Sequence, residues 1–198
     1  MGCGLAVVSN RGKKKVMITV IAGTNRVGSR SLHLAKQMVR WYEEAGEAVT
    51  LLDLSTLPVS IFAPSVYGEK PAEFVTRFIE PVMAADGLHL VIPEYNGSFP
   101  GALKYFIDLL PFPEAFDGRP TAFVGISAGG SGGVRPVEHM QQVFGYRNAY
   151  IYPRRVFIPE IYKVMDADGL LTDESLVERL RFQIQKFSQF TRQMSVKE

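Results

Sequence analysis

Cysteine is almost absent from this sequence of 198 residues, and its scarcity excludes two kinds of architecture. The one cysteine, Cys3, cannot form a disulfide within the chain or build a cysteine-based zinc site. The sequence also has little excess of one sign of charge over the other, because the formal net charge is only +2. Composition therefore gives no tendency toward nucleic acid or an acidic membrane surface. No apolar run approaches the roughly 20 residues that span a bilayer. We expect a cytoplasmic protein with no membrane, nucleic-acid or metal partner.

The first residues match targeting signals poorly. The apolar stretch Leu5–Val8 is shorter than the roughly seven residues of a signal-peptide core. Gly2 fits the start of a myristoylation motif, but Ala6 stands where that motif has serine or threonine. We expect residues 1–15 to be a disordered leader and residues 16–195 to form a single domain.

Apolar runs alternate with helical patterns along the chain. The β-branched run Val16–Ala22 is typical of a strand buried on both faces. Further strands are expected at Ala48–Asp53, Gly87–Ile92 and Pro120–Ile126, and within Ala149–Ile158. Helices are expected at Ser29–Ala45, Pro71–Ala85, Pro100–Leu110, Val134–Gly145 and Asp173–Gln193, with a long loop over Leu54–Lys70. Pro81 must kink or shorten the second helix. This alternation predicts a parallel sheet with helices on both faces.

Two doubly wound folds fit this order of elements. A dinucleotide-binding fold would place Gly-x-Gly-x-x-Gly after the first strand, but the turn Gly23–Ser29 lacks the middle glycine. The sequence therefore favours a flavodoxin-like α/β three-layer sandwich, with a five-stranded parallel sheet in the order 2-1-3-4-5. In that fold the FMN site draws on the turns after strands one and three.

The turn after the first strand carries groups that suit a phosphate. It leads into a helix N-terminus, where free N–H groups and the helix dipole favour an anion. Around it stand hydroxyls of Thr24, Ser29 and Ser31, the amide of Asn25 and the guanidinium of Arg26. Helix capping is the alternative, but it explains only Ser29. We interpret this turn as a cradle for a terminal phosphate ester.

The turn after the third strand, Pro93-Glu94-Tyr95-Asn96-Gly97-Ser98, offers an aromatic face, an amide, a hydroxyl and backbone N–H groups. This set suits a flat ring with polar edges better than a metal or a peptide. A structural turn, with Tyr95 in the core, explains the motif equally well in isolation. Its position at the same sheet edge as the phosphate-type turn favours the ligand.

The turn after the fourth strand is Ser127-Ala128-Gly129-Gly130-Ser131-Gly132-Gly133. Such a glycine run indicates an unusual backbone, a close approach or flexibility, and by itself is weak evidence. Its place beside the other two turns strengthens it. Arg135, just beyond, fits a phosphate contact and a solvated side chain equally well.

These segments together resemble one family. The first turn, the motif that runs from Pro93 through Gly101 and Lys104 to Asp108, and the loop beginning at Ser127 are similar to the NADPH-dependent FMN reductase family. That family includes enzymes described as azoreductases, quinone reductases and chromate reductases. The resemblance runs from about Val16 to the final helix. Thr24 replaces the family's usual serine and keeps its hydroxyl, whereas Ser31 and Tyr105 stand where the family often has asparagine.

The resemblance implies bound FMN, NADPH or NADH as co-substrate, and a homodimer or homotetramer. It implies that Thr24, Arg26, Ser29 and Ser31 hold the FMN phosphate. It also implies that Glu94, Tyr95, Asn96, Gly97 and Ser98 line the isoalloxazine ring, and that Ser127, Gly129 and Gly130 flank the flavin. Asn25 and Pro93 complete the expected cofactor-binding set.

The implied reaction is ping-pong hydride transfer from NAD(P)H through FMN to a small oxidant, namely a quinone, an azo compound, a flavin or a metal oxyanion. No dedicated acid–base residue is expected, because the flavin supplies the chemistry. His33, His89 and His139 lie in predicted helices or a buried strand, and we expect structural or surface roles for them. A flavodoxin-type electron carrier and a flavin-binding sensor without turnover remain as alternatives. The net charge of +2 argues against the carrier.

Three further patterns bear on partners. Arg30, Lys104 and Arg135 are each plausible partners for the 2′-phosphate of NADPH, so the choice between NADPH and NADH stays open. Apolar residues exceed one helix face after the second turn and predict a subunit interface; they are Tyr105, Phe106, Leu109, Leu110, Phe112 and Phe116. Asp166-Ala167-Asp168-Gly169 resembles part of a calcium loop but lacks the downstream acidic ligand, so we expect a turn.

Overall fold

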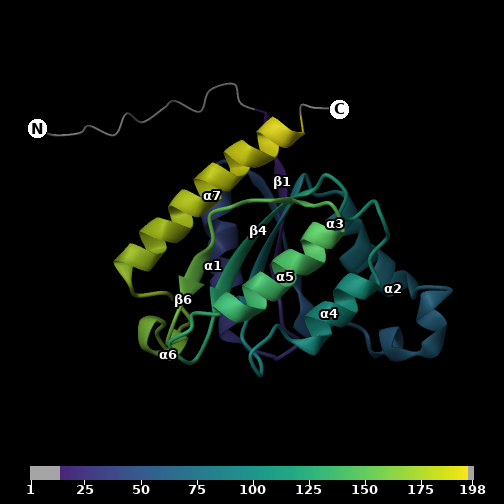
Figure 1. Ribbon diagram of the computed structural model, residues 1–198, viewed down its shortest axis with the longest axis horizontal. Coiled ribbons are helices and arrows are strands. Elements are labelled where there is room, and N and C mark those ends of the chain that lie inside the picture. Colours follow the sequence, from purple (N-terminus) through teal and green to yellow (C-terminus); the bar gives the residue numbers. More distant parts are fainter. Residues whose placement is uncertain (1–13, 196–198) are drawn as a thin grey trace, which may run out of the picture.

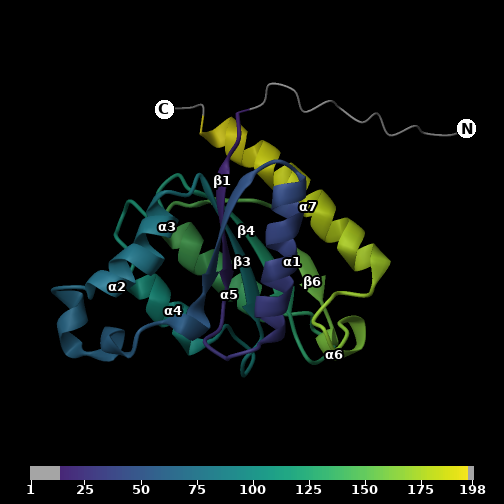
Figure 2. The ribbon, with the colours of Figure 1, turned by 180° about the vertical axis from the view of Figure 1, so that it is seen from behind.

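The computed structural model describes residues 14–195, and Figures 1 and 2 show it from opposite sides. Nearly all of the expected leader, residues 1–15, lies outside the described residues. The strands are β1 (Met17–Ala22), β2 (Ala48–Asp53), β3 (Gly87–Pro93), β4 (Pro120–Ile126), β5 (Tyr150–Ile151) and β6 (Val156–Ile158). The helices are α1 (Arg30–Glu44), α2 (Ala72–Phe74), α3 (Glu80–Met83), α4 (Gly101–Asp108), α5 (Val134–Tyr146), α6 (Ile161–Val164) and α7 (Glu174–Met194). Short 3₁₀ turns at Leu54–Thr56, Val59–Phe62 and Pro64–Tyr67 occupy the long loop.

The sheet is parallel and has the order β2-β1-β3-β4-β5, with β6 also paired to β4. The predicted flavodoxin-like order is therefore confirmed. Helices α1 and α7 lie on one side of the sheet, and α2 to α5 lie on the other (Figures 1 and 2). Every residue of β3 and β4 is buried, because both faces are covered. Within the described part of the chain, no helix combines the length and the apolar character that crossing a bilayer requires.

The fifth strand position differs from the prediction, because two short strands replace one. Strand β5 pairs with the start of β4, and β6 pairs with its end. Pro153 lies between them and has no N–H to donate to the sheet. In the gap, Nε2 of the buried Gln183 on α7 donates to the carbonyl oxygens of Phe123 (3.0 Å) and Arg154 (2.7 Å). A side chain thus satisfies the strand carbonyl that the interruption leaves unpaired.

The helix predicted over Pro71–Ala85 is distorted where Pro81 required it. A π-helical turn, Val75–Ile79, separates α2 from α3. Proline cannot donate an N–H within a helix, and a π turn immediately before it accommodates the missing bond.

The apolar residues that predicted a subunit interface lie mostly in the chain's own core. Phe106, Leu109, Leu110 and Phe116 are buried against β3, β4 and the helices on that face. Tyr105 is half-buried and stacks on Phe62, with ring centroids 5.0 Å apart. Only Phe112 of the six is exposed. This pattern therefore gives little support to an interface on that face.

Candidate active site

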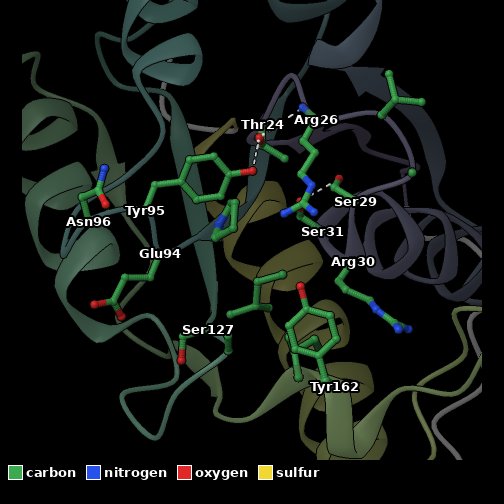
Figure 3. A pocket seen from close by; sticks show the side chains of 16 residues that line it. Thr24, Arg26, Ser29, Arg30, Ser31, Glu94, Tyr95, Asn96, Ser127 and Tyr162 are labelled. Atoms are coloured by element: carbon green, nitrogen blue, oxygen red, sulfur yellow. Dashed lines mark hydrogen bonds between the residues drawn. The ribbon is translucent and has the colours of Figure 1, made fainter.

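A cavity of about 520 Å³ lies where β1, β3, β4 and β6 end. Figure 3 shows its lining side chains converging from the turns after these strands. The lining residues are Thr24, Arg26, Val27, Gly28, Ser29, Arg30, Ser31, Pro93, Glu94, Tyr95, Asn96, Ile126, Ser127, Ala128, Ile161 and Tyr162. The carboxyl edge of a parallel sheet is the usual ligand site of this architecture.

The structure brings most of the predicted site residues to this cavity. Those that line it are Thr24, Arg26, Ser29, Ser31, Pro93, Glu94, Tyr95, Asn96 and Ser127. Those outside its lining are Asn25, Gly97, Ser98, Gly129 and Gly130. Sequence reasoning missed the contribution of α6, from which Ile161 and Tyr162 complete the wall. The signal was available, because α6 follows the last parallel strand and so starts at the same sheet edge.

The N-terminus of α1 is prepared for an anion. Ser29 caps the helix by accepting a hydrogen bond from the N–H of Leu32 (3.2 Å), and its Oγ lies 3.0 Å from Oγ of Ser31. The first turn of α1 contains no acidic residue, so no side chain there offsets the positive end of the helix dipole. The capping alternative is therefore true of Ser29, and the cap leaves the positive end of the helix dipole without an acidic side chain in the first turn.

Two arginines add positive charge at this end of the cavity. Arg26 is exposed, and its guanidinium has no hydrogen-bond or ion-pair partner within residues 14–195. Arg30 donates from Nη1 to the carbonyl of Asp166 (2.8 Å) and lies 5.2 Å from the ring centroid of Tyr162. Neither arginine meets a carboxylate in the described chain. Lys104, by contrast, is ion-paired with Asp108 at 2.7 Å.

The ring turn, Tyr95–Ser98, is a tight reversal that closes through backbone hydrogen bonds. Tyr95 N–H donates to Ser98 O (2.8 Å), and Ser98 N–H donates to Tyr95 O (3.0 Å). Asn96 and Gly97 have positive φ values of 51° and 75°, the geometry of a type I′ turn. Backbone conformation therefore accounts for Gly97. The N–H groups of Asn96 and Gly97 have no hydrogen-bond partner in the described residues; Asn96 lines the cavity, and Gly97 follows it just outside the lining.

Tyr95 connects the ring turn to the phosphate-type turn. The hydroxyl of Thr24, which is buried, donates to the Tyr95 hydroxyl at 2.9 Å (Figure 3). The same Thr24 oxygen accepts the N–H of Arg26 at 3.3 Å. Gly23 holds the turn against β3, because its N–H donates to Val91 O (2.9 Å) and a Cβ there would lie 2.8 Å from that oxygen. The two turns therefore form one hydrogen-bonded unit.

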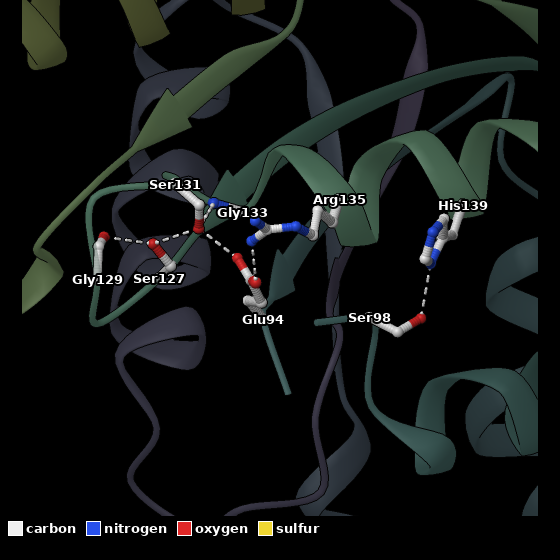
Figure 4. A network of polar contacts seen from close by, with 8 residues as sticks. All are labelled: Glu94, Ser98, Ser127, Gly129, Ser131, Gly133, Arg135 and His139. Atoms are coloured by element: carbon white, nitrogen blue, oxygen red, sulfur yellow. Dashed lines mark hydrogen bonds and ion pairs between the residues drawn. The ribbon is translucent and has the colours of Figure 1, made fainter. Parts of the chain in front are cut away.

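A polar network joins Glu94, the residue before the ring turn, to the glycine loop, residues 127–133 (Figure 4). The carboxylate of Glu94 accepts a hydrogen bond from Ser131 and pairs with Arg135 at 3.0 Å. Oγ of Ser131 also lies 3.3 Å from Oγ of Ser127, whose hydroxyl donates to Gly129 O (2.6 Å). Only 14% of the Glu94 side chain is exposed. Glu94 thus faces the glycine loop, and Arg135 has a carboxylate partner.

The glycines after β4 have two different roles. Gly132 and Gly133 have φ values of 64° and 78°, and a Cβ on Gly133 would lie 2.6 Å from the Ile126 nitrogen. A Cβ on Gly125 of β4 would lie 2.6 Å from Gly133 O, so the start of α5 packs directly on the strand. Gly129 and Gly130 have open space around the Cβ position. Gly132 and Gly133 therefore permit close packing, whereas Gly129 and Gly130 leave the loop without side chains on its open side.

The remaining predicted features resolve as local structure. Oγ of Ser98 lies 2.9 Å from Nδ1 of His139 on α5, so one histidine does contact the ring turn (Figure 4). Asp166 accepts the N–H of Leu170 (2.7 Å) in a turn that Met165 and Leu171 close. Within residues 14–195, no group of three or more His, Cys, Asp or Glu side chains is arranged to hold a metal.

Comparisons with known proteins bear on this site. A family model described as NADPH-dependent FMN reductase matches residues 16–170. The NAD(P)H-dependent FMN reductase of Pseudomonas aeruginosa is 32% identical over 184 residues, which cover 90% of this chain and 97% of that protein. The chain belongs to the NADPH-dependent FMN reductase family. As a member of this family it is an oxidoreductase, and the resemblance drawn from the three turns is confirmed.

Other relatives agree with this family. A quinone reductase of Escherichia coli strain K12 is 27% identical over 189 residues, 92% of this family member and 99% of that protein. The flavoenzyme NAD(P)H:(acceptor) oxidoreductase FerB of Paracoccus denitrificans superposes with a TM-score of 0.75 at 24% identity, over 90% of this chain and 98% of FerB. The superposition supports the fold.

Proposed function

We propose that this oxidoreductase passes a hydride from NAD(P)H through bound FMN to a small oxidant, such as a quinone, an azo compound, a free flavin or a metal oxyanion. The observation that carries the proposal is the uncompensated N-terminus of α1, with Arg26 beside it, at one end of a 520 Å³ cavity. FMN, when bound, would supply hydride acceptance and electron release.

The residues present fit FMN. A terminal phosphate requires several donors and positive charge, and the hydroxyls of Ser29 and Ser31 and the free guanidinium of Arg26 provide both. A flat ring with polar edges requires donors at a shallow turn, and the free N–H groups of Asn96 and Gly97 provide them. The volume is within the roughly 300–1,000 Å³ of small-molecule sites.

The chain's own contribution is binding and orientation. Arg26 neutralises phosphate charge, the type I′ turn presents its two N–H groups, and the Glu94–Ser131 contact fixes the ring turn relative to the glycine loop. No side chain at the site is needed to move a proton, so we propose no catalytic acid or base. Ser127, Gly129 and Gly130 would flank the ring from the end of β4.

Two measurements on purified protein test this proposal. We expect a yellow preparation that releases FMN on denaturation and that oxidises NADPH or NADH steadily with a small quinone and no protein partner. Because one cavity serves both nicotinamide and oxidant, double-reciprocal plots should be parallel. Protein that binds FMN without oxidising NAD(P)H would favour the carrier or the sensor. Protein that cannot be reconstituted with FMN would remove the proposal.

We further propose that the protein forms a homodimer or homotetramer. Exposed apolar side chains support this: Val59, Phe62 and Tyr67 lie on the loop after β2, and Phe112, Tyr146 and Tyr150 lie at or beyond the ends of α4 and α5. Light scattering at working concentration should give at least twice the chain mass, and a monomer mass would refute the proposal.

A further inference from the structure

A second concave region lies at the interrupted edge of the sheet, between α7 and the segment that joins β5 to β6. It has a volume of about 580 Å³ and shares no lining residue with the candidate active site. We call it the arginine groove. Its lining residues are Pro153, Arg154, Arg155, Val156, Phe157, Glu178, Arg179, Phe182 and Gln183. Figure 1 shows α7 and β6, the two elements that flank it.

The arginine groove carries an excess of positive charge. Three arginines and one glutamate line it, and none of these four is in an ion pair within residues 14–195. Arg179 has no side-chain partner in the described chain, and Arg155 donates only to the neutral amide oxygen of Gln141 (3.0 Å). Three positive charges against one negative charge leave the groove with a net positive charge, and a bound anion offsets the repulsion among the arginines.

Aromatic rings and a buried amide hold the groove in shape. Arg154 lies 5.3 Å from the ring centroid of Phe182, and Arg155 lies 5.5 Å from that of Phe157. A guanidinium stacked on a ring keeps its N–H groups available to phosphate or carboxylate oxygens. Gln183, only 1% exposed, binds the Arg154 carbonyl and so fixes the loop that carries both arginines. The cations are therefore positioned by the fold.

We propose that the arginine groove binds a small polyanion with two or more phosphate groups. Arginine suits phosphate because its planar N–H groups can donate in pairs to phosphate oxygens. The groove is bounded, and its volume matches that of small-molecule sites. An extended nucleic acid requires a long basic stripe, whereas this chain has a net charge of only +2. The proposal stands independently of the flavin proposal, because the two regions have no residue in common.

Titration calorimetry of the full chain at low ionic strength tests the groove, with tripolyphosphate as the probe. We expect saturable binding that weakens about tenfold in Arg154→Gln and again in Arg179→Gln, because each removes a charge-assisted hydrogen-bond donor. The double variant Arg154→Lys with Arg179→Lys should bind with intermediate affinity, since charge is kept and the paired donors are lost. Thermal midpoints would verify that each variant is folded.

Two controls locate the binding. Arg181→Gln changes the same helix, but Arg181 pairs with Glu44 at 2.7 Å and does not line the groove, so binding should be unaffected. Arg26→Gln changes the candidate active site, and the tripolyphosphate binding that depends on Arg154 should persist in this variant. ATP as a second probe distinguishes a free polyphosphate from a nucleotide. If ATP binds with the same affinity as tripolyphosphate, the phosphate chain alone is recognised; if ATP binds more tightly, the groove recognises a nucleotide.

Several results would overturn the proposal. One is the absence of saturable tripolyphosphate binding. Another is a double variant, Arg154→Gln with Arg179→Gln, that binds tripolyphosphate as tightly as the unsubstituted protein does. A third is the loss of all binding in Arg26→Gln alone. Binding of a single-stranded oligonucleotide without binding of tripolyphosphate would also contradict it, because it would identify a nucleic-acid surface instead.

Discussion

At the scale of single residues, Arg26 has a distinctive position among the charges of the candidate active site. It is exposed beside the capped N-terminus of α1 and meets no carboxylate in the described chain, whereas Arg135 and Lys104 are paired. A charge without a protein partner costs little desolvation within the fold and is free to neutralise a ligand.

We therefore predict that Arg26→Gln weakens FMN binding by about tenfold or more, because a charge-assisted contact to phosphate is lost. Quenching of flavin fluorescence on titration would measure it. Arg40→Gln is the matched control, since Arg40 is an exposed arginine on α1 that does not line the cavity. Equal affinities in the two variants would place the phosphate elsewhere.

A second residue-scale prediction concerns the glycine loop. Gly133→Ala should lower the free energy of unfolding by at least about 2 kcal/mol, because alanine is strained at φ 78° and its Cβ would lie 2.6 Å from the Ile126 nitrogen. Gly130→Ala should change it by less than about 0.5 kcal/mol, since the position is open and has no positive φ. Urea denaturation of both proteins measures the difference. Similar losses would contradict this reading of the loop.

The sequence could predict some of these residues and not others. Asn96-Gly97 is a strong signal for a type I′ turn, and the positive φ values agree with it. The glycine run showed that a special backbone was present. It could not show which glycines pack, because the contact of Gly133 is made with Gly125 on the preceding strand. Likewise, the ion pair between Glu94 and Arg135 becomes apparent only once the fold places β3 and β4 side by side.

At the scale of elements, alternating patterns were sufficient for the order of the sheet, and they failed at its edge. Apolar runs over β1, β3 and β4 identify buried parallel strands by themselves. The division between β5 and β6 lies at Pro153, which the sequence shows, but the donor that satisfies the carbonyl oxygens there is Gln183, which is distant in sequence on α7. The contribution of α6 to the cavity was within reach of the sequence, because α6 follows the last parallel strand and so starts at the same sheet edge.

We predict that Gln183→Leu lowers the free energy of unfolding by roughly 2–3 kcal/mol. It would leave the carbonyl oxygens of Phe123 and Arg154 without their donor, and unsatisfied buried acceptors are costly. Gln185→Leu is the control, because Gln185 is exposed two residues away on α7 and should be nearly neutral. Equal changes in the free energy of unfolding in the two variants would show that the Gln183 amide does not stabilise the interruption between β5 and β6.

At the scale of the whole molecule, the sheet separates two apolar cores, and a histidine lies buried between the sheet and α1 and α7. His89 on β3 is fully buried, with Nδ1 2.7 Å from the Tyr42 hydroxyl and its ring 5.4 Å from that of Phe187. Burial lowers the pKa of His89 from 6.5 to about 3.

This pKa gives stability a defined dependence on pH. Between about pH 6.5 and about pH 3 the unfolded chain binds one proton that the folded chain excludes, so acidification favours unfolding. The free energy of unfolding should fall by about 1.4 kcal/mol per pH unit across this window from His89 alone. His89→Gln should remove that part of the slope. Denaturation at several pH values would compare the two proteins, and identical slopes would contradict a buried neutral histidine.

The divided strand at the sheet edge also affects how copies of this chain can meet. A long edge strand with free N–H and C=O groups is a template onto which another molecule can add a strand, the first step toward fibrous aggregation. Here that edge is short at β5, interrupted at Pro153, and carries Arg154 and Arg155. We expect this side of the sheet to resist strand addition. Copies of the chain should then associate through helices and loops, and form closed oligomers and not fibres.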